Sequence, residues 1–209
     1  MPSSPGSRSE VLVEKQGPAL AVTFNRPRQR NAMTWAMYDG LYQACERADA
    51  DDDVRVLVLR GAGEDAFVAG TDIRQFADFT GGADGVEYER KITRVLDRLE
   101  DVNVPTVAAI RGYCVGAGLA IAAVCDLRLA TPDARFGIPI ARTLGNCLSM
   151  PTYALLLHHL GPAAPWICCS TRRSTPVGRR TRRASWPSPR RISTRPSSRP
   201  STAWPGMPR

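Results

Sequence analysis

Two glycine-containing segments carry the residues whose types and spacing are best suited to chemistry. The first is Ala-Phe-Val-Ala-Gly-Thr-Asp-Ile at residues 66–73, and the second is Ile-Arg-Gly-Tyr-Cys-Val-Gly-Ala-Gly-Leu at residues 110–119. Each leads into a helical pattern, and the first N–H groups of a helix lack intrahelical partners. Two such groups that converge on one oxygen would stabilise an enolate or a tetrahedral oxyanion. A single donor of this kind typically contributes about 2.7–4 kcal/mol.

These glycines also have other interpretations. A glycine-rich turn between a strand and a helix can be purely structural, or it can belong to a dinucleotide- or phosphate-binding loop. Neither segment has the spacing G-x-G-x-x-G, and no Lys-Ser or Lys-Thr pair follows as in a P-loop. Small residues at Gly70, Gly116, Ala117 and Gly118 would let a substrate carbonyl approach the backbone. The pattern therefore favours oxyanion stabilisation over phosphate binding.

Apolar runs alternate with amphipathic segments and predict the elements that position the two turns. Strands are expected at residues 19–24, 54–59, 105–110 and 126–130. Helices are expected at residues 33–49, 92–99 and 116–124. The last three strands are apolar enough for burial on both faces, and the last helix is apolar enough for burial all round. The alternation predicts an α/β fold with right-handed crossovers.

Charge is distributed unevenly along the 209 residues. Residues 165–209 hold eleven of the 28 basic residues and no acidic one, so the rest of the chain carries 17 basic and 20 acidic side chains. A basic balance suggests nucleic acid or an anionic membrane, and here that inference can apply only to the tail. The tail lacks sustained apolar periodicity and is rich in proline and arginine, which predicts disorder.

The remaining sequence features indicate an ordinary intracellular protein. Residues 1–9 are rich in proline, serine and glycine, lack the apolar run of a secretory signal, and are expected to form a disordered lead-in. No stretch approaches the roughly 18 apolar residues of a membrane span. The six cysteines have no metal-ligand spacing and are expected to be reduced thiols. We therefore expect a cytoplasmic protein without a metal site or a membrane partner.

Five sequence blocks, in this order, resemble the enoyl-CoA hydratase/isomerase (crotonase) family over residues 11–164. The blocks are Phe24-Asn25-Arg26-Pro27 with Asn31-Ala32-Met33, residues 66–73, residues 112–118, Cys125-Asp126-Leu127-Arg128, and Ala134-Arg135-Phe136-Gly137. The resemblance implies a core of stacked ββα turns, residues 10–164, that forms a superhelix and binds an acyl-CoA thioester as substrate. It implies no further cofactor and no nucleic-acid partner, and an assembly of trimers or dimers of trimers where the C-terminus is intact.

The resemblance also implies roles for individual residues. The backbone N–H groups of Thr71 and Ala117 would hold the thioester oxygen, and Ala69, Asp72 and Ile73 would line the path of coenzyme A. For Asp72, capping of a helix N-terminus is an equally good interpretation. A further residue, Arg26, could reach the phosphates of coenzyme A, although a solvated surface arginine is the simpler interpretation.

Two positions depart from the family pattern. Hydratases of this family use two glutamates, and the corresponding positions here are Ala120 and Ile140, neither of which can carry a proton. General acid–base catalysis typically contributes about 10²–10⁴-fold, so the usual hydratase mechanism is hard to place. Other polar residues are available nearby, although structural roles are the simpler interpretation for them: Arg142, Asn146, Cys147, His158 and His159. Two functions stay open, an enzyme whose base lies elsewhere and a non-catalytic acyl-CoA binder or inactive truncated family member.

The tail has an explanation at the level of the gene. Residues 165–169, Pro-Trp-Ile-Cys-Cys, can be back-translated and read from the third base of the proline codon as Met-Asp-Leu-Leu-Leu. That sequence resembles the apolar helix of the family at this place. The hypothesis is a one-base frame slip near codons 161–165. The rival is a genuine basic tail that binds nucleic acid, although the tail lacks the interleaved aromatic residues of a single-strand platform.

Overall fold

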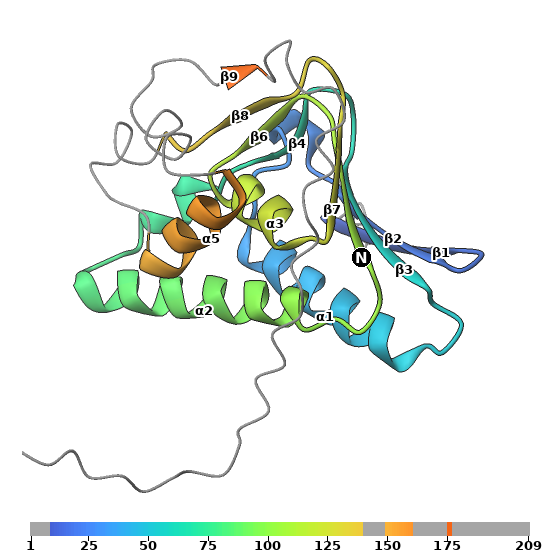
Figure 1. The fold of residues 1–209 in the computed structure, drawn as a ribbon. Helices are drawn as coiled ribbons and strands as arrows, with labels where there is room; N and C mark the ends of the chain where they lie inside the picture. Colours follow the sequence, from blue (N-terminus) through green and yellow to red (C-terminus); the bar gives the residue numbers. More distant parts are fainter. Residues whose placement is uncertain (1–8, 140–148, 161–174, 177–209) are drawn as a thin grey trace, which may run out of the picture.

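A computed structural model describes residues 9–139, 149–160 and 175–176, which form two sheets and a set of helices (Figure 1). The larger sheet has the order β1-β2-β3-β5-β7. Its strands are β1 (Val11–Gln16), β2 (Ala19–Phe24), β3 (Val56–Gly61), β5 (Thr106–Ile110) and β7 (Leu127–Ala130). Strands β1 and β2 are antiparallel, and the following neighbours are parallel.

The smaller sheet has the order β4-β6-β8-β9. Its strands are β4 (Ala66–Ala69), β6 (Tyr113–Val115), β8 (Arg135–Gly137) and β9 (Thr175–Pro176). The α-helices are α1 (Trp35–Ala50), α2 (Gly82–Glu100), α3 (Ala117–Val124) and α5 (Met150–Leu160), and the 3-10 helices are η1 (Pro27–Gln29) and η2 (Ile73–Phe76).

The chain repeats one unit in which a strand of the large sheet is followed by a strand of the small sheet and then by a helix. The units β3-β4-α2 and β5-β6-α3 follow this order, and β7-β8 begins the next one. Because equivalent strands pair in parallel, the units stack and the helices gather on the inside of the angle between the sheets (Figure 1). The expected α/β fold of stacked ββα turns is therefore correct.

Helix α3 lies at the centre of this arrangement. It contacts β4, β6, α2 and α5, and its residues from Gly118 to Ala123 are buried, as its apolar composition predicts. A Cβ atom on Gly118 would lie 2.2 Å from the carbonyl oxygen of Val68 on β4. Close packing of α3 against β4 therefore requires glycine at this position.

The predicted strands have nearly the observed bounds, but the burial on both faces that we expected for the strands at 54–59, 105–110 and 126–130 is wrong. Strand β2 is buried on both faces, whereas β3 and β5 alternate between more and less buried residues. On β7, Leu127 is 53% exposed and Leu129 is 64% exposed. For β7 the reason is position, since it is the last strand of the described sheet and an apolar sequence alone does not reveal which strand stands at an edge.

Most of the terminal segments lie outside the described residues, including residues 1–8 and nearly all of residues 165–209. The exception is β9, in which Thr175 and Pro176 pair antiparallel with Phe136 and Arg135 of β8. These two residues are the part of the segment 165–209 that the structure describes, and the expectation of a disordered tail stays a prediction. An edge strand such as β8 offers unpaired backbone groups, and a short segment containing proline can still pair there. In the part of the chain that the structure describes, no helix combines the length and hydrophobicity needed to cross a bilayer.

Candidate functional site

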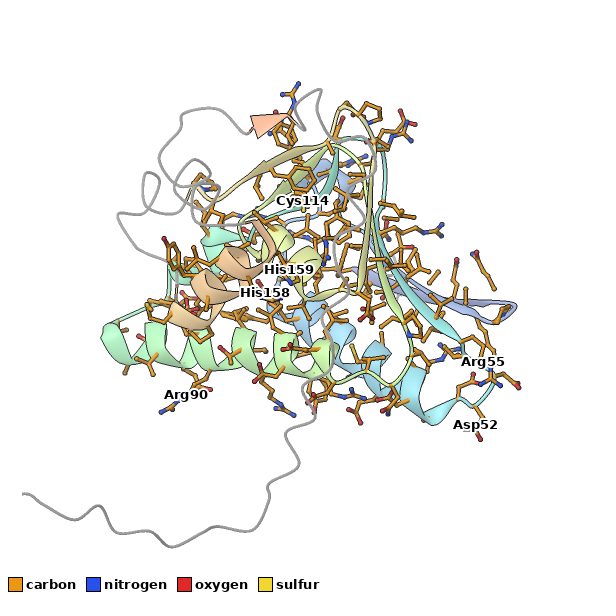
Figure 2. The ribbon with its side chains drawn as sticks, viewed as in Figure 1. Asp52, Arg55, Arg90, Cys114, His158 and His159 are labelled. Carbon is orange, nitrogen blue, oxygen red and sulfur yellow. The ribbon has the colours of Figure 1, made fainter. Side chains whose placement is uncertain are left out.

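The two glycine turns lie side by side because β4 and β6 are adjacent parallel strands. The register pairs Ala69 with Val115, so Thr71 and Ala117, two residues further along, occupy equivalent places in the two turns. A Cβ atom built on Gly116 would lie 3.4 Å from the Cα atom of Gly70, which shows that the backbones are in contact there. Figure 2 labels Cys114 on β6, just before the second turn.

Both turns depend on a backbone conformation that favours glycine. Gly70 has φ +90°, and Gly116 has φ +55° with ψ −121°. Residues with a Cβ atom rarely adopt such angles. The glycines also leave no side chain between the two turns. The sequence therefore folds into two turns that approach each other through residues without side chains.

The backbone around Thr71 directs its N–H group away from the neighbouring loop. Met33 donates to the carbonyl oxygen of Gly70 at 2.9 Å and accepts from the N–H of Asp72 at 2.9 Å. Successive N–H groups of an extended segment point to opposite sides, so the N–H of Thr71 points away from Met33. Ala117 is the first residue of α3, and Gly116 before it provides no side-chain cap. Within the described residues, neither the Thr71 N–H nor the Ala117 N–H has a protein acceptor.

The first turn is also held by a side-chain amide. Gln75 in η2 accepts from the backbone N–H of Trp35 at 2.7 Å through Oε1. Its Nε2 group donates to the carbonyl oxygen of Met33 at 3.1 Å. Together with the Met33 bridge, these bonds fix the turn against the start of α1. Fixed donors are what an oxyanion site requires, since they need no reorganisation when charge develops.

Asp72 caps the 3-10 helix that follows the first turn. Its side chain is buried and accepts from the N–H of Arg74 at 3.2 Å, which agrees with the capping interpretation. The carboxylate also forms ion pairs with Arg74 at 2.6 Å and with Arg26 at 3.1 Å. The hydrogen bond from Arg74, with that from Arg26, holds the pKa of Asp72 well below its usual range. This carboxylate is therefore ionised and fully engaged by protein donors.

Arg26 is not the solvated surface residue that the simpler interpretation predicted. Its side chain is only 12% exposed and pairs with Glu10 at 3.1 Å as well as with Asp72. It also donates to the carbonyl oxygen of Ala32 at 2.6 Å. The loop after β2 folds back over the first turn and buries the guanidinium between these acceptors. Arg26 therefore holds the turn in place, and contact with the phosphates of coenzyme A stays a prediction.

The other expected site residues lie in different environments. Ile73 is 59% exposed and Ala69 is half-buried, and their contact with coenzyme A stays a prediction. Ala120 is buried on α3, one helical turn from Ala117. Ile140, Arg142, Asn146 and Cys147 lie outside the described residues, and their proposed roles stay predictions. Among the described residues, no group of histidine, cysteine and carboxylate side chains could hold a metal ion.

His158 and His159, labelled in Figure 2, lie on α5 beside α3. Their ring centroids are 5.0 Å apart. His158 is exposed, whereas His159 is half-buried and burial lowers its pKa to about 4. His159 is therefore neutral at pH 7. These positions agree with the polar-face and packing roles expected for the two histidines.

Sequence reasoning missed two tyrosines that contact the first turn. The Oγ1 atom of Thr71 lies 2.7 Å from the hydroxyl oxygen of Tyr38 on α1 and 2.8 Å from that of Tyr88 on α2. Tyr38 follows Met37 on the buried face of its helix, and a buried tyrosine hydroxyl usually has a partner. That pattern would have flagged Tyr38, but no local pattern could have linked it to Thr71.

Comparisons with known proteins agree with this geometry. The family model for enoyl-CoA hydratase/isomerase matches residues 14–173. A short-chain-enoyl-CoA hydratase of Clostridium acetobutylicum is 35% identical over 131 residues, which cover 63% of this chain and 50% of that protein. An (E)-benzylidenesuccinyl-CoA hydratase of Thauera aromatica is 38% identical over 128 residues, covering 61% of this chain and 49% of that protein.

The fold has solved counterparts of the same kind. An enoyl-CoA hydratase/carnithine racemase from Magnetospirillum magneticum superimposes with a TM-score of 0.77 at 33% identity, covering 82% of this chain and 64% of that chain. The chain spans about half the length of the curated relatives it matches. The match to the family model ends at residue 173, inside the segment 165–209 that we expected to depart from the family.

Proposed function

Because the chain belongs to the enoyl-CoA hydratase/isomerase (crotonase) family, we propose that it binds an acyl-CoA thioester and stabilises the enolate form of its acyl group. The N–H groups of Thr71 and Ala117 would donate to the thioester oxygen. The observation that carries the proposal is their equivalent position in adjacent turns, with no protein acceptor among the described residues for either group. A backbone N–H group that is shielded from water and has no protein acceptor is costly, unless a ligand or an ordered water accepts from it.

The start of α3 adds to the stabilisation of negative charge. The N-terminus of a helix carries a partial positive charge, and Ala117 is the first residue of α3. A thioester oxygen that gains negative charge as the α-proton leaves would therefore interact more strongly than the neutral carbonyl. Only interactions of this kind, stronger in the transition state than in the ground state, accelerate a chemical step.

The acid–base half of the usual mechanism has no equivalent support. Ala120 presents a methyl group where the family has a glutamate, and Ile140 occupies the other glutamate position. We therefore expect crotonyl-CoA hydration at least about 10²-fold slower than in relatives that carry the glutamates. A rate comparable to theirs would contradict the inference that these two replacements disable the usual route.

The direct test compares two ligands that differ only at the carbonyl group. Butyryl-CoA contains the thioester oxygen, whereas the thioether S-butyl-CoA has the same chain without it. We expect calorimetric titration to give at least about tenfold tighter binding of the thioester, the difference that corresponds to about one hydrogen bond. Equal affinities would contradict the oxyanion site, and failure to bind either ligand would contradict acyl-CoA binding altogether.

A second candidate function is acyl-CoA binding without catalysis. The observation that favours it is the methyl side chain of Ala120 at a position where a base is expected. Incubation of butyryl-CoA with the protein in D₂O separates the two functions. Incorporation of deuterium at the α-carbon would require enolate formation and a base, and so indicate an enzyme. Tight binding without exchange would indicate the binder.

A further inference from the structure

Three hydroxyl groups from three separate elements meet beneath the first turn. Thr71 contributes Oγ1, Tyr38 comes from α1, and Tyr88 comes from α2, with oxygen–oxygen distances of 2.7 and 2.8 Å to Thr71. These residues are 33 and 17 positions away from Thr71 in the sequence. The contact therefore exists only because the fold brings α1 and α2 together under the turn.

The three hydroxyl groups are neutral and form one hydrogen-bonded cluster. Burial raises the pKa of Tyr38 and of Tyr88 above the ordinary value, so both keep their protons at neutral pH. Tyr38 is only 1% exposed, and its hydroxyl group interacts with the hydroxyl groups of both Thr71 and Tyr88. A buried O–H without an acceptor is costly, and each of the three hydroxyl groups finds its partners within this cluster.

Aromatic packing holds the rings in place independently of their hydroxyl groups. The ring of Tyr88 lies edge-on to Trp35 at 5.6 Å and to Phe76 at 4.9 Å between centroids. The ring of Tyr38 lies 6.3 Å from that of Trp35. A change from tyrosine to phenylalanine would therefore remove a hydroxyl group and leave the ring contacts intact.

The backbone of Thr71 is restrained on one side by the Met33 bridge, and its side chain is restrained by the two tyrosines. We propose that Tyr38 and Tyr88 are positioning residues, which act through the Thr71 hydroxyl to hold the Thr71 N–H in the direction of the substrate oxygen. The inference rests on the proposed function and adds to it the residues that aim one of its two donors. A misdirected donor loses most of its effect, because hydrogen bonds weaken steeply with angle.

The test uses a chromophoric ligand that reports polarisation of the carbonyl directly. The absorption band of 2,4-hexadienoyl-CoA moves to longer wavelength when hydrogen bonds withdraw electrons through its thioester oxygen. The full-length protein and the variants Tyr88→Phe, Tyr38→Phe, Thr71→Val and Thr71→Ser are titrated with this ligand. Tyr42→Phe is the matched control, since Tyr42 lies on α1 and packs with Arg94 rather than with the turn.

We expect the wild-type protein and Tyr42→Phe to give the full shift of the band, and Thr71→Ser to restore most of the shift that Thr71→Val loses. A clearly smaller shift is expected for Tyr88→Phe, Tyr38→Phe and Thr71→Val. In these variants the ratio of affinities for butyryl-CoA and its thioether should fall about tenfold. Circular dichroism checks that each variant is folded. Rescue by serine separates the hydroxyl group from general packing, because serine lacks the threonine methyl group but keeps the oxygen.

Two results would overturn the inference while leaving the proposed function intact. One is a full shift in Tyr88→Phe and Thr71→Val, and the other is an equal loss in Thr71→Ser and Thr71→Val. Failure of the proposed function is distinguishable, because the wild-type protein itself would then give no shift and no preference for the thioester.

Discussion

At the scale of single residues, the site depends on a glycine in the second turn and on a buried ion pair beside the first turn. Gly116 has φ +55°, a conformation that residues with a Cβ atom rarely adopt, and lies close to Gly70, so glycine is required here by the backbone conformation of the turn. Arg26 and Asp72 form a buried ion pair that joins the loop after β2 to the start of η2. Both features fix the backbone next to Thr71.

A methyl group at Gly116 should impair ligand binding more than folding. Gly116→Ala forces an unfavourable backbone conformation that costs about 1–3 kcal/mol, and relief of that strain would rotate the peptide that carries the Ala117 N–H. We expect most of the thioester preference over the thioether to be lost. The control is Gly85→Ala in α2, where an added Cβ meets nothing within 4 Å. That variant should be more stable by about 0.5–1 kcal/mol and bind normally.

Loss of the Asp72 carboxylate should destabilise the fold in a pH-dependent manner. Asp72→Asn leaves the buried guanidinium of Arg26 with one carboxylate fewer and should cost about 3 kcal/mol at pH 7. Because the folded pKa of Asp72 is lowered, the stability it provides is present above the unfolded value of about 3.9 and is lost as pH falls below it. Urea unfolding at pH 7 and pH 3 should therefore show a difference between wild type and Asp72→Asn that shrinks at pH 3. The exposed Asp78→Asn is the control, and a constant difference would contradict this account.

At the scale of elements, the sequence pattern predicted the bounds of strands and helices better than their burial and their pairing in sheets. The predicted bounds of β2 are correct. Strand β3 begins two residues after the predicted start, because the N–H of Val54 donates to the carbonyl oxygen of Asp51 in the preceding turn. Strand β5 excludes Pro105, which has no N–H to donate. The strands of the small sheet went unpredicted, since three or four residues are too few to show a period and their pairing is non-local.

In the candidate site, too, the features that depend on neighbouring residues could be predicted, whereas those that depend on long-range contacts could not. Asp72 as a helix cap is encoded locally, in the residues that follow it, and sequence alone suggested it. The burial of Arg26 depends on Asp72, 46 residues away, and the contacts of Thr71 depend on two helices. A local sequence pattern does not show which distant residues come into contact. The structure was therefore needed to find the contacts of Arg26, Tyr38 and Tyr88.

The packing of α5 against α3 should make stability sensitive to mild acid. Burial lowers the pKa of His159 from 6.5 to about 4, so the folded protein resists protonation that the unfolded chain accepts. Because the unfolded state binds more protons, stability is complete above pH 6.5 and declines as pH falls from 6.5 to about 4. His159→Gln should remove most of this decline in urea midpoints, whereas His158→Gln, at the exposed neighbour, should retain it. An unchanged decline in His159→Gln would show that other groups cause it.

At the scale of the whole molecule, two unlike parts share one chain. The body is mildly acidic and folds as stacked ββα units, while residues 165–209 carry eleven arginines and no acid. The exposed Leu127 and Leu129 on β7 present an apolar edge where the described sheet ends. Neighbouring exposed apolar side chains on one strand face usually require a cover, which a basic segment poor in apolar residues is badly suited to provide.

The frame-slip hypothesis predicts that restoring one base near codons 161–165 will change the behaviour of the whole protein. Resequencing of the genomic region that encodes residues 155–175 should find the missing or extra base. The protein expressed from the corrected frame should unfold at higher temperature than the 209-residue chain, because an apolar C-terminal segment can bury surface that the arginine-rich one cannot. Light scattering should find it as a trimer or a dimer of trimers, and the 209-residue chain as a smaller species. A confirmed sequence, together with a trimeric 209-residue chain, would contradict the hypothesis. RNA binding that disappears when residues 165–209 are deleted would instead support a genuine basic tail.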